Sequence, residues 1–401
     1  MLKGKTVVLG VTGSIAAYKI PNLARMLIKS GADVHVLMTK NAENFINPIT
    51  FETLTKHKCL IDTFDRNFEY SVEHVALAKA ADIVMIAPAS ANVIGKIACG
   101  IADDMLTTTV MACPCKKIIS PAMNHNMFHN PIVQDNIKRL KSFGYEIVEP
   151  DTGMLANGDT GDGRMPDEET LFWYILKHIA MPHDLDGRKV LVTAGATREA
   201  IDPVRFITNH STGKMGAAVA KNAMLRGADV TLVAGAVETE LPPFVRVIRT
   251  ESAADMADAV FEAAKESDII IKAAAVADYR PKSVSDEKIK KQGDGMTIEL
   301  ERTTDILAQL GKNRRAGQLI CGFSMETENV LENSRKKLAG KNIDLIAANS
   351  IKEEGAGFGV DTNVITLISA DREIRLPKMS KDDAAGRIID RLLEMEKECM
   401  V

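Results

Sequence analysis

Two short segments of this 401-residue chain carry the residue types best suited to chemistry. Residues 205–216 read RFITNHSTGKMG, and residues 121–124 read PAMN. Both are rich in small and polar residues that expose backbone N–H groups, and both follow an apolar run typical of a β-strand. Loops that expose N–H groups after a strand are suited to phosphate-bearing ligands. The chain therefore carries two candidate sites for such ligands, which predicts an enzyme with two activities.

The first hundred residues hold further candidates, each at the end of a predicted strand. Gly13 and Ser14 open a helix-like stretch, so backbone N–H groups and the Ser14 hydroxyl can hold a phosphate. Serine is equally common there as a plain helix N-cap. Thr39 ends the next strand, at the edge where α/β sheets bind ligands. Residues 87–92 read APASAN, and small residues such as Ser90 would let a flat ring approach closely, although a tight turn has the same composition.

Composition argues against several classes of protein. The net charge of −4 gives no basic surface for nucleic acid. No apolar run approaches the roughly 18 residues of a membrane span, and the first ten residues are strand-like rather than a signal peptide. The six cysteines lack disulfide spacing, which predicts a cytoplasmic protein. Cys113 and Cys115 are either half of a metal site or structural residues at a strand edge, and no second Cys/His pair has matching spacing.

The elements that would position these residues follow the same plan twice. Residues 5–11 form an apolar strand, followed by a helix-like stretch to residue 30, the sequence GADV and a second strand. Residues 188–234 repeat this order, with a strand at 189–193, a long loop, a helix at 213–226 and again GADV. Strands that alternate with helices at this spacing predict parallel sheets with right-handed crossovers. We therefore expect an α/β protein with two tandem doubly wound domains, Rossmann-like and three-layered.

The boundary between these domains is expected within residues 180–187, where MPHD breaks the preceding helix. This gives domains at residues 1–182 and 183–401. Residues 151–165 and 281–295 are too rich in glycine or charge to be packed, so both are expected to be mobile flaps. The remaining strands are expected at residues 83–87, 117–120, 146–148, 245–249, 269–273, 319–323, 345–348 and 364–369.

The motifs resemble those of two known enzyme families. The first half is similar to the flavin-dependent cysteine decarboxylases in residues 10–19 (GVTGSIAAYK), 87–92, 100–104 (GIADD) and 121–124. The second half resembles phosphopantothenate–cysteine ligase in residues 205–216, 274–280 (AAVADYR) and 287–291 (EKIKK). The order and spacing of these motifs are similar to the fused bacterial and archaeal proteins of coenzyme A biosynthesis over essentially the whole chain.

For residues 1–182 the resemblance implies a flavodoxin-like domain that uses FMN to decarboxylate 4′-phosphopantothenoylcysteine. Loss of CO₂ from a cysteine amide needs an electron sink, and oxidation of the thiol to a thioaldehyde by the flavin supplies one. His74 would be a base in thiol oxidation, whereas the sequence alone indicates an ordinary surface or core histidine. Asn124 would hold the substrate carboxylate, with Met123 beside it. The residues implied in FMN binding are Gly13, Ser14, Thr39, Ser90 and Asn92.

One position departs from the family pattern. The family's flap reads GxxACGxxGxGRM, with the cysteine as proton donor, and residues 153–165 of this chain read GMLANGDTGDGRM. Asn157 stands where the cysteine belongs, and a neutral amide cannot act as a general acid near neutral pH. The hypothesis is that CO₂ loss survives while the final reduction is impaired.

For residues 183–401 the resemblance implies a ligase that uses CTP to join 4′-phosphopantothenate to cysteine. Lys288, within a lysine run that would otherwise be a solvated surface, would promote formation of the acyl-cytidylate. Asn209 would carry that intermediate on to the amide, and Arg205 would contact the substrate. Mg²⁺ would be held mainly by the CTP phosphates and water, with no firm protein ligand. The implied nucleotide contacts are Ala273, Ala274, Asp278, Lys288, Phe323, Lys337 and Lys341, of which the last two lie four apart on a predicted helix.

Two other classes of protein remain open on the residues alone. A nicotinamide dehydrogenase would share the fold, but GxGxxG followed by an acidic residue is missing after both opening strands. A regulatory flavoprotein without activity would explain Asn157, and it would bind FMN while releasing no CO₂ and making no amide. As partners, the resemblance implies small-molecule substrates and a homo-oligomer, a dodecamer built from trimers and dimers, with no nucleic acid and no membrane.

Overall fold

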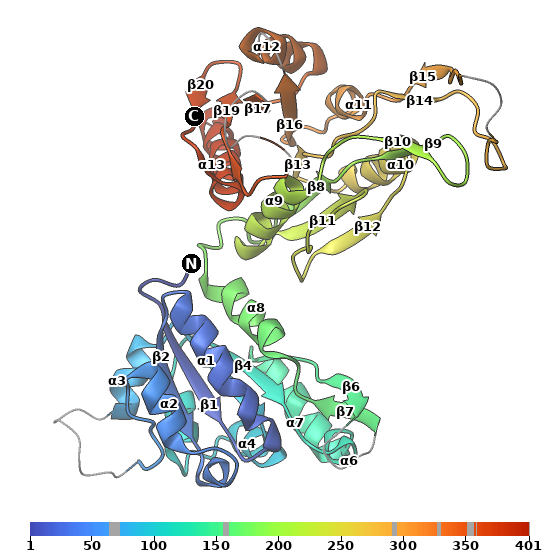
Figure 1. The fold of residues 1–401 in the computed structure, drawn as a ribbon. Coiled ribbons are helices and arrows are strands. Elements are labelled where there is room, and N and C mark those ends of the chain that lie inside the picture. The colour runs from blue at the N-terminus through green and yellow to red at the C-terminus, as the bar shows by residue number, and fades with distance from the viewer. Residues whose placement is uncertain are drawn as a thin grey trace. The chain divides into compact units, whose positions relative to one another are not determined.

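The computed structural model of the chain describes residues 1–63, 73–154, 160–290, 295–326, 330–350, 357 and 359–400. It divides into two compact units, Met1–Pro182 and His183–Val401 (Figure 1). Each unit has its own sheet and its own hydrophobic core, as an independent domain does.

The sheet of the first unit has five parallel strands in the order β2-β1-β3-β4-β5. Their bounds are Thr6–Val11 (β1), Asp33–Met38 (β2), Ile83–Ala89 (β3), Lys116–Pro121 (β4) and Glu146–Ile147 (β5). All seven residues of β3 are buried, because helices cover both faces of the sheet and leave no side of a central strand in water. The order reverses between β1 and β3, so their connections run to opposite sides and open a crevice at the carboxyl ends.

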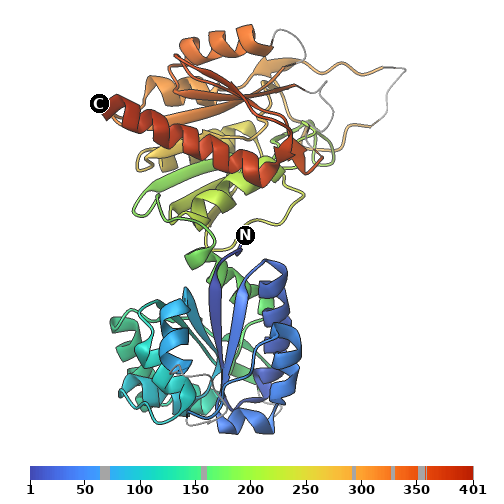
Figure 2. The same cartoon turned by 90° about the vertical axis from the view of Figure 1, so that its left-hand side faces the viewer.

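Helices cover both faces of this sheet (Figure 2). On one side α1 (Ile20–Lys29) packs against α8 (Glu168–Ile179), and on the other α4 (Ala91–Ala98) packs against α5 (Met105–Ala112) and α7 (Pro131–Ser142). This is the expected three-layer arrangement. The remaining helical segments are η1 (Ile15–Lys19), η2 (Lys40–Asn44), α2 (Pro48–Thr55), α3 (Glu73–Ala80) and α6 (His125–Phe128).

Residues 151–165 were expected to be an unpacked flap, and that expectation is wrong for the described part. Asp151–Met154 (β6) and Thr160–Arg164 (β7) pair as an antiparallel hairpin. The hairpin also joins the rest of the unit, because Met123 N donates to Gly163 O at 3.1 Å. A Cβ on Gly163, whose φ is +124°, would lie 2.3 Å from Met123 O. Glycine therefore lets this sequence pack despite its lack of apolar residues.

The sheet of the second unit has eight strands in the order β12-β11-β8-β13-β16-β17-β19-β20. The parallel strands are β8 (Lys189–Ala194), β11 (Asp229–Ala234), β12 (Arg246–Arg249), β13 (Ile269–Lys272), β16 (Leu319–Glu326) and β17 (Leu345–Ser350). The last two, β19 (Thr366–Ile368) and β20 (Glu373–Arg375), run antiparallel. The prediction of a parallel sheet is therefore correct for the first six strands and wrong for this edge. The connection between β19 and β20, residues 369–372, is too short for the helix that a parallel crossover needs.

Helices again lie on both faces of the second sheet (Figure 2). On one face α9 (Lys214–Leu225) packs against α13 (Lys381–Met400), while α10 (Ala253–Ala264), α11 (Ile306–Lys312) and α12 (Val330–Lys341) form the other layer. Three short antiparallel pairs stand outside the main sheet. They join β9 (Arg198–Ala200) to β10 (Phe206–Thr208), β14 (Tyr279–Pro281) to β15 (Leu300–Arg302), and β18 (Thr362–Asn363) to β21 (Met379–Ser380).

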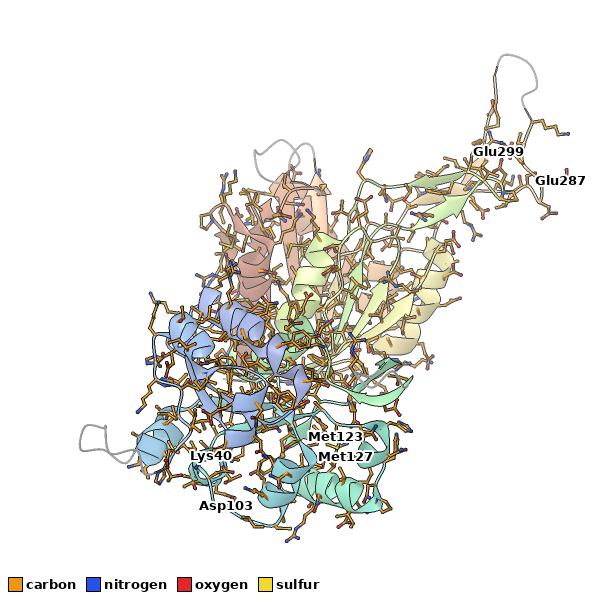
Figure 3. The ribbon with its side chains drawn as sticks, turned by 60° about the horizontal axis from the view of Figure 1, so that its bottom comes forward. Lys40, Asp103, Met123, Met127, Glu287 and Glu299 are labelled. Atoms are coloured by element: carbon orange, nitrogen blue, oxygen red, sulfur yellow. The ribbon has the colours of Figure 1, made fainter. Side chains whose placement is uncertain are left out.

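Most of the flap expected at residues 281–295 is an arm that extends from the β14–β15 pair. Figure 3 shows Glu287 and Glu299 on this arm, extending away from the sheet and helices of the second unit. Among the described residues of the chain, no helix is both long and apolar enough to cross a bilayer.

Candidate active sites

The crevice of the first unit is held together by Thr12, which directly follows β1. Its hydroxyl donates to Pro88 O at 2.7 Å and accepts from Ser90 N at 2.9 Å, and its side chain is fully buried. One hydroxyl therefore ties the loop after β1 to the loop after β3 at the point where the strand order reverses. The sequence motif around residue 12 contained Thr12, but this role was not foreseen.

Three of the expected flavin contacts lie around this crevice, at the ends of three strands. Ser14 caps η1 and Ser90 caps α4, each with its hydroxyl accepting from a backbone N–H group. Thr39 follows β2, and its Oγ1 is buried without a hydrogen-bond partner among the described residues. A buried hydroxyl without a partner costs about 1–3 kcal/mol, so Thr39 fits a site that a polar ligand completes. The helix-capping alternative for Ser14 is confirmed, and its role in phosphate binding stays a prediction.

The position of Gly13 has no space for a side chain. A Cβ placed there would lie 2.8 Å from the Cβ atom of Asn41. The loop after β1 therefore lies close to η2, and the backbone N–H groups of that loop stay accessible. Asn92, the fifth expected contact, lies in the first turn of α4 with its side chain exposed.

The loop after β4 carries Met123 and Asn124, both partly exposed. Asn124 caps α6, with Oδ1 accepting from Asn126 N at 2.9 Å. The β6–β7 hairpin lies against this loop through the bond between Met123 N and Gly163 O. The structure thus brings the expected substrate residues next to the expected flap. Asn157, the position of the family's cysteine, lies outside the described residues.

A buried lysine of η1 joins that helix to the residues that directly follow the hairpin. Lys19 is 7% exposed, and its Nζ donates to Met165 O at 2.9 Å and to Pro166 O at 3.1 Å. Burial lowers the pKa of Lys19, and Arg164 lowers it further against three nearby carboxylates. Lys19 lies in η1, five residues after Ser14. Its two hydrogen bonds therefore connect the end of the β6–β7 hairpin to the helix that follows the loop after β1.

His74, the expected base, lies in the first turn of α3 and is partly buried. In an α/β unit a helix that precedes a parallel strand runs antiparallel to it, so the start of α3 lies toward the carboxyl edge of the sheet. His74 is therefore on the side of the unit that carries the crevice. Within the described part of the chain, no hydrogen bond or ion pair joins His74 to the other expected residues.

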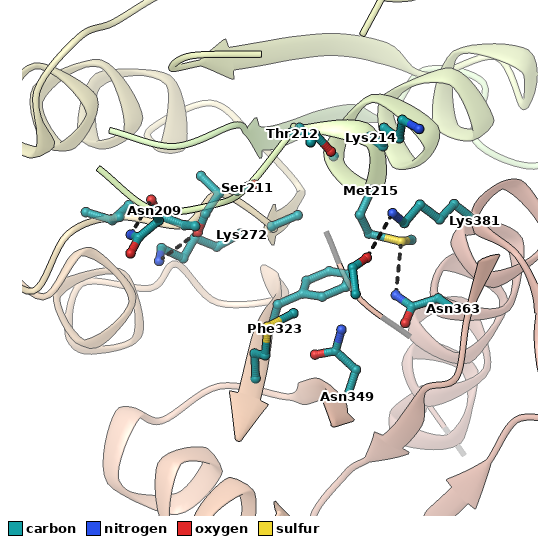
Figure 4. Close-up of a pocket in the computed structure, with 18 of the residues that line it drawn as sticks. Asn209, Ser211, Thr212, Lys214, Met215, Lys272, Phe323, Asn349, Asn363 and Lys381 are labelled. Carbon is teal, nitrogen blue, oxygen red and sulfur yellow. Dashed lines mark hydrogen bonds between the residues drawn. The ribbon is translucent and has the colours of Figure 1, made fainter. Parts of the chain in front are cut away.

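The second unit contains a cavity of about 420 Å³ at the carboxyl ends of β13, β16 and β17 (Figure 4). A volume of this size accepts a nucleotide-sized ligand. Five of the residues expected from the sequence line it: Asn209, Ala273, Ala274, Asp278 and Phe323. The loop after β10 and the start of α9, residues 211–216, form another wall.

Buried threonines fix the loop that carries most of these residues. Thr193 Oγ1 accepts from Ala274 N and Thr197 Oγ1 from Ala277 N, both at 3.0 Å. Asn209 Nδ2 then donates to Ala275 O at 3.1 Å (Figure 4). The expected acyl-transfer residue is therefore oriented by the same backbone segment that lines the cavity.

Lys337 and Lys341, the expected phosphate contacts, lie on α12 as predicted. Lys341 Nζ pairs with Asp305 at 2.9 Å, and Lys337 Nζ donates to Ser324 Oγ at 3.4 Å. Asp305 caps α11 and Ser324 follows Phe323 in β16, so both lysines face the carboxyl end of the sheet.

Arg205 and Lys288 lie outside this cavity. Asp202 accepts bonds from the guanidinium of Arg205 and from Ile289 N at 3.2 Å, while Arg205 Nη2 donates to Ile289 O at 2.8 Å. The hydrogen bonds with Arg205 hold the pKa of Asp202 well below its usual range, although burial opposes them. Arg205 therefore anchors the base of the arm on which Lys288 lies exposed. The structure does not bring Lys288 to the cavity wall.

The cavity also contains residues that the sequence did not indicate. Asn349, Asn363 and Lys381 come from the last third of the chain. Lys381 Nζ donates to Gly357 O at 3.1 Å, and Asn363 Nδ2 contacts Met215 Sδ at 3.8 Å (Figure 4). Lys272 ends β13 and also lines the wall.

Cys113 and Cys115 are both free thiols, between α5 and β4. A hydrogen bond with Cys113 lowers the pKa of Cys115 to about 7, and burial opposes the shift. Neither belongs to the groups of His, Cys, Asp and Glu side chains that lie close enough together to hold a metal within the described residues.

The fold and its two sites define a class: a tandem α/β enzyme with a candidate ligand site at the switch point of one sheet and a cavity at the carboxyl edge of the other. Comparison with known families agrees with this class. Residues 1–180 match the flavoprotein family, and residues 185–395 match the family described as DNA/pantothenate metabolism flavoprotein C-terminal domain.

Full-length relatives identify the family. The chain is 47% identical to the coenzyme A biosynthesis bifunctional protein CoaBC of Bacillus subtilis (strain 168), over 99% of each chain. It is 41% identical to the protein of that name from Escherichia coli (strain K12), over 98% of this chain and 97% of the relative. The chain therefore belongs to the family of bifunctional coenzyme A biosynthesis proteins, which confirms the resemblance seen in its motifs.

Among solved structures, the C-terminal domain of a coenzyme A biosynthesis bifunctional protein CoaBC is similar to the second half. It is 43% identical, covers 54% of this chain and 99% of its own, and has a TM-score of 0.46.

Proposed function

We propose that the second unit joins 4′-phosphopantothenate to cysteine with CTP, and that the first unit decarboxylates the product on FMN. One observation carries this proposal: each unit places its own set of family motifs at the carboxyl edge of its own sheet. The domain limits are residues 1–182 for the decarboxylase and 183–401 for the ligase. The family to which the chain belongs supports the pairing of the two activities.

The residues around the first crevice fit FMN. The Thr39 hydroxyl is buried without a partner among the described residues, and the Gly13 position has no space for a side chain. Gly13, Ser14 and Thr39 would hold the phosphate and ribityl chain, and Ser90 and Asn92 would border the ring. FMN would accept the electrons of the substrate thiol and return them after CO₂ has left.

The chain's own residues orient the substrate. Asn124 would hold the leaving carboxylate, with Met123 beside it, while His74 would take the thiol proton. The hairpin packed on Met123 would exclude water from this space. With Asn157 in place of a thiol, we propose that the final protonation is impaired.

In the second unit, one carboxylate oxygen of 4′-phosphopantothenate attacks the α-phosphorus of CTP and pyrophosphate leaves. The cysteine amine then attacks the acyl carbon, loses a proton and expels CMP. Ala273, Ala274, Asp278 and Phe323 would form the cytidine pocket, with Asn209 orienting the acyl group. Lys337 and Lys341 would contact phosphates that also bind Mg²⁺. Lys288 would join them when the arm moves from its extended position, and Arg205 would hold the arm's base.

We also propose a cytoplasmic homo-oligomer, a dodecamer, in line with the family. Sedimentation velocity of the purified full-length protein measures this directly. A monomer at micromolar concentration would contradict it.

The proposed activities are tested together by incubating the protein with 4′-phosphopantothenate, cysteine, CTP and Mg²⁺, with product masses followed over time. The expected result is pyrophosphate, CMP and phosphopantothenoylcysteine, followed by the oxidised enethiol, which is lighter than phosphopantothenoylcysteine by CO₂ and two hydrogen atoms. A product that retains the oxidised enethiol supports the assignment for Asn157, and a yellow protein supports FMN. A colourless protein that neither binds added FMN nor consumes CTP would overturn the proposal.

A further inference from the structure

The proposed reaction assigns no role to Lys272. It is the last residue of β13, and it lines the 420 Å³ cavity of the second unit. Its Nζ donates to Ala274 O at 3.3 Å, one residue before the carbonyl that holds Asn209. Figure 4 shows Lys272 and Asn209 along the same side of the cavity. Its amine therefore faces the space where a ligand of Asn209 would lie.

The charges around Lys272 leave its amine without a partner of opposite sign. Among the described residues, no carboxylate forms an ion pair with Lys272. Asp305, the carboxylate with the largest effect on it, is already paired with Lys341 at 2.9 Å. Burial, together with the charges of Lys341 and Lys337, lowers the pKa of Lys272 to about 8. Asp305 and Asp278 oppose this shift without cancelling it.

A buried amine that faces two other lysines is unfavourable unless an anion enters. A nucleotide supplies several phosphate oxygens, and its arrival would reverse the electrostatic balance at Lys272. A structural lysine would behave differently. Lys19 of the first unit is buried against two carbonyl groups, whereas Lys272 has one carbonyl contact at 3.3 Å and borders a cavity.

We propose that Lys272 is a third phosphate-binding lysine of the nucleotide site, beside Lys337 and Lys341, and that it takes up a proton when the nucleotide binds. The proton comes from the buffer and converts the neutral amine to an ammonium, which pairs with a phosphate oxygen. This inference rests on the proposed use of CTP by the second unit. It adds a residue to the site and a proton to the binding equilibrium.

The experiment is calorimetric titration of the full-length protein with CTP and Mg²⁺ at pH 8, in two buffers of different ionisation enthalpy. The dependence of the measured heat on the buffer gives the protons taken up. A group with a pKa of about 8 is half neutral at pH 8, so uptake of about 0.5 proton is expected. At pH 7 the uptake should fall to about 0.1 proton.

Two substitutions separate charge from proton exchange. Lys272→Met should lose the uptake and bind CTP about tenfold or more weakly, because a charged hydrogen bond is lost. Lys272→Arg keeps a permanent charge, so it should bind CTP with little loss and without uptake. Lys265→Met is the matched control, since Lys265 is exposed and pairs with Glu262, and it should behave as the unmodified protein. Because FMN absorbance reports only on the first unit, the thermal unfolding of each full-length variant is compared with that of the unmodified protein to show that the second unit is folded.

The outcomes distinguish this inference from the function on which it rests. If CTP binds and the Met variant takes up as many protons as the unmodified protein, Lys272 does not have this role and the ligase assignment stands. If the Arg variant takes up protons as well, the proton goes elsewhere and the inference is equally overturned. If the unmodified protein neither binds CTP nor releases pyrophosphate, both the proposed function and the inference fail.

Discussion

Replacement of Thr12 by valine tests how the crevice of the first unit is held open. Valine keeps the shape of threonine and removes only the hydroxyl. That hydroxyl joins Pro88 O and Ser90 N, both in or beside the loop after β3, and the site is fully buried. A buried group left without its hydrogen bond costs about 1–3 kcal/mol, and two such groups are created, so we expect a loss of about 2–4 kcal/mol.

The loss should be local, because the affected groups lie in one pair of loops. Hydrogen exchange of the Ser90 amide measures it directly, without the two-state assumption that a two-domain protein violates. A loss of about 2 kcal/mol accelerates exchange through local opening roughly thirtyfold. FMN affinity should fall in the same variant.

Thr12→Ser is the matched control for this experiment. It keeps the hydroxyl and loses one methyl group, which costs about 1 kcal/mol. Equal exchange at Ser90 in the Val and Ser variants would refute the reasoning, since the hydroxyl would then contribute nothing to the loop.

Three further predictions follow from other contacts. Gly163→Ala should displace the hairpin from Met123, because the new Cβ would lie 2.3 Å from Met123 O. The rate of decarboxylation should fall at least tenfold, while ligase activity in the same sample is unchanged. A variant that decarboxylates as fast as the unmodified protein would contradict the packing of the hairpin on Met123. Burial raises the pKa of Glu146, but the hydrogen bonds and charges of His178 and Lys177 together outweigh burial and lower that pKa to about 2. Since that pKa is lowered from 4.5, the ionised Glu146 stabilises the fold by up to about 3 kcal/mol above pH 4.5, and this stabilisation is lost as the pH falls toward 2. In Glu146→Gln, the free energy of unfolding measured with urea should therefore depend less on pH between 4.5 and 2. An unchanged dependence on pH would show that other carboxylates dominate. Asp202→Asn should weaken the anchor of the arm and raise the KM for CTP with a smaller effect on kcat, whereas an effect confined to kcat would place Asp202 in the chemistry.

The sequence predicts the framework of both units well, because the framework follows from apolar runs. β3 is a continuous apolar segment, and it is buried along its whole length. The β6–β7 hairpin has no such signal. Its pairing depends on close approach at Gly163 and on a contact with Met123, 40 residues earlier, so its local sequence resembles a mobile loop.

The residues of the candidate sites also differ in whether the sequence could predict them. Ser14 and Asn209 lie in motifs that directly follow a strand, so their positions could be predicted. Asn349, Asn363 and Lys381 reach the cavity only because β17, β18 and α13 fold back against α9 and the main sheet. No local pattern marks such residues as part of a site. The sequence did not indicate Lys272 for another reason. A lysine at the end of a strand is usually exposed to solvent, and only the structure shows the cavity beside it.

In both units a threonine hydroxyl holds the loop beside the candidate site, while the residues that surround the two sites differ. Thr12 in the first unit and Thr193 in the second each follow or end the first strand, and each fixes the loop after the neighbouring strand across the switch point. The fold therefore sets where a ligand lies, and the residues around the loop decide which ligand it is. The first crevice offers hydroxyls such as that of Thr39, which suit a single phosphate that stays bound. The cavity of the second unit is lined by Lys272, with Lys337 and Lys341 on the neighbouring α12, and these lysines would suit the chain of phosphates that we propose it binds.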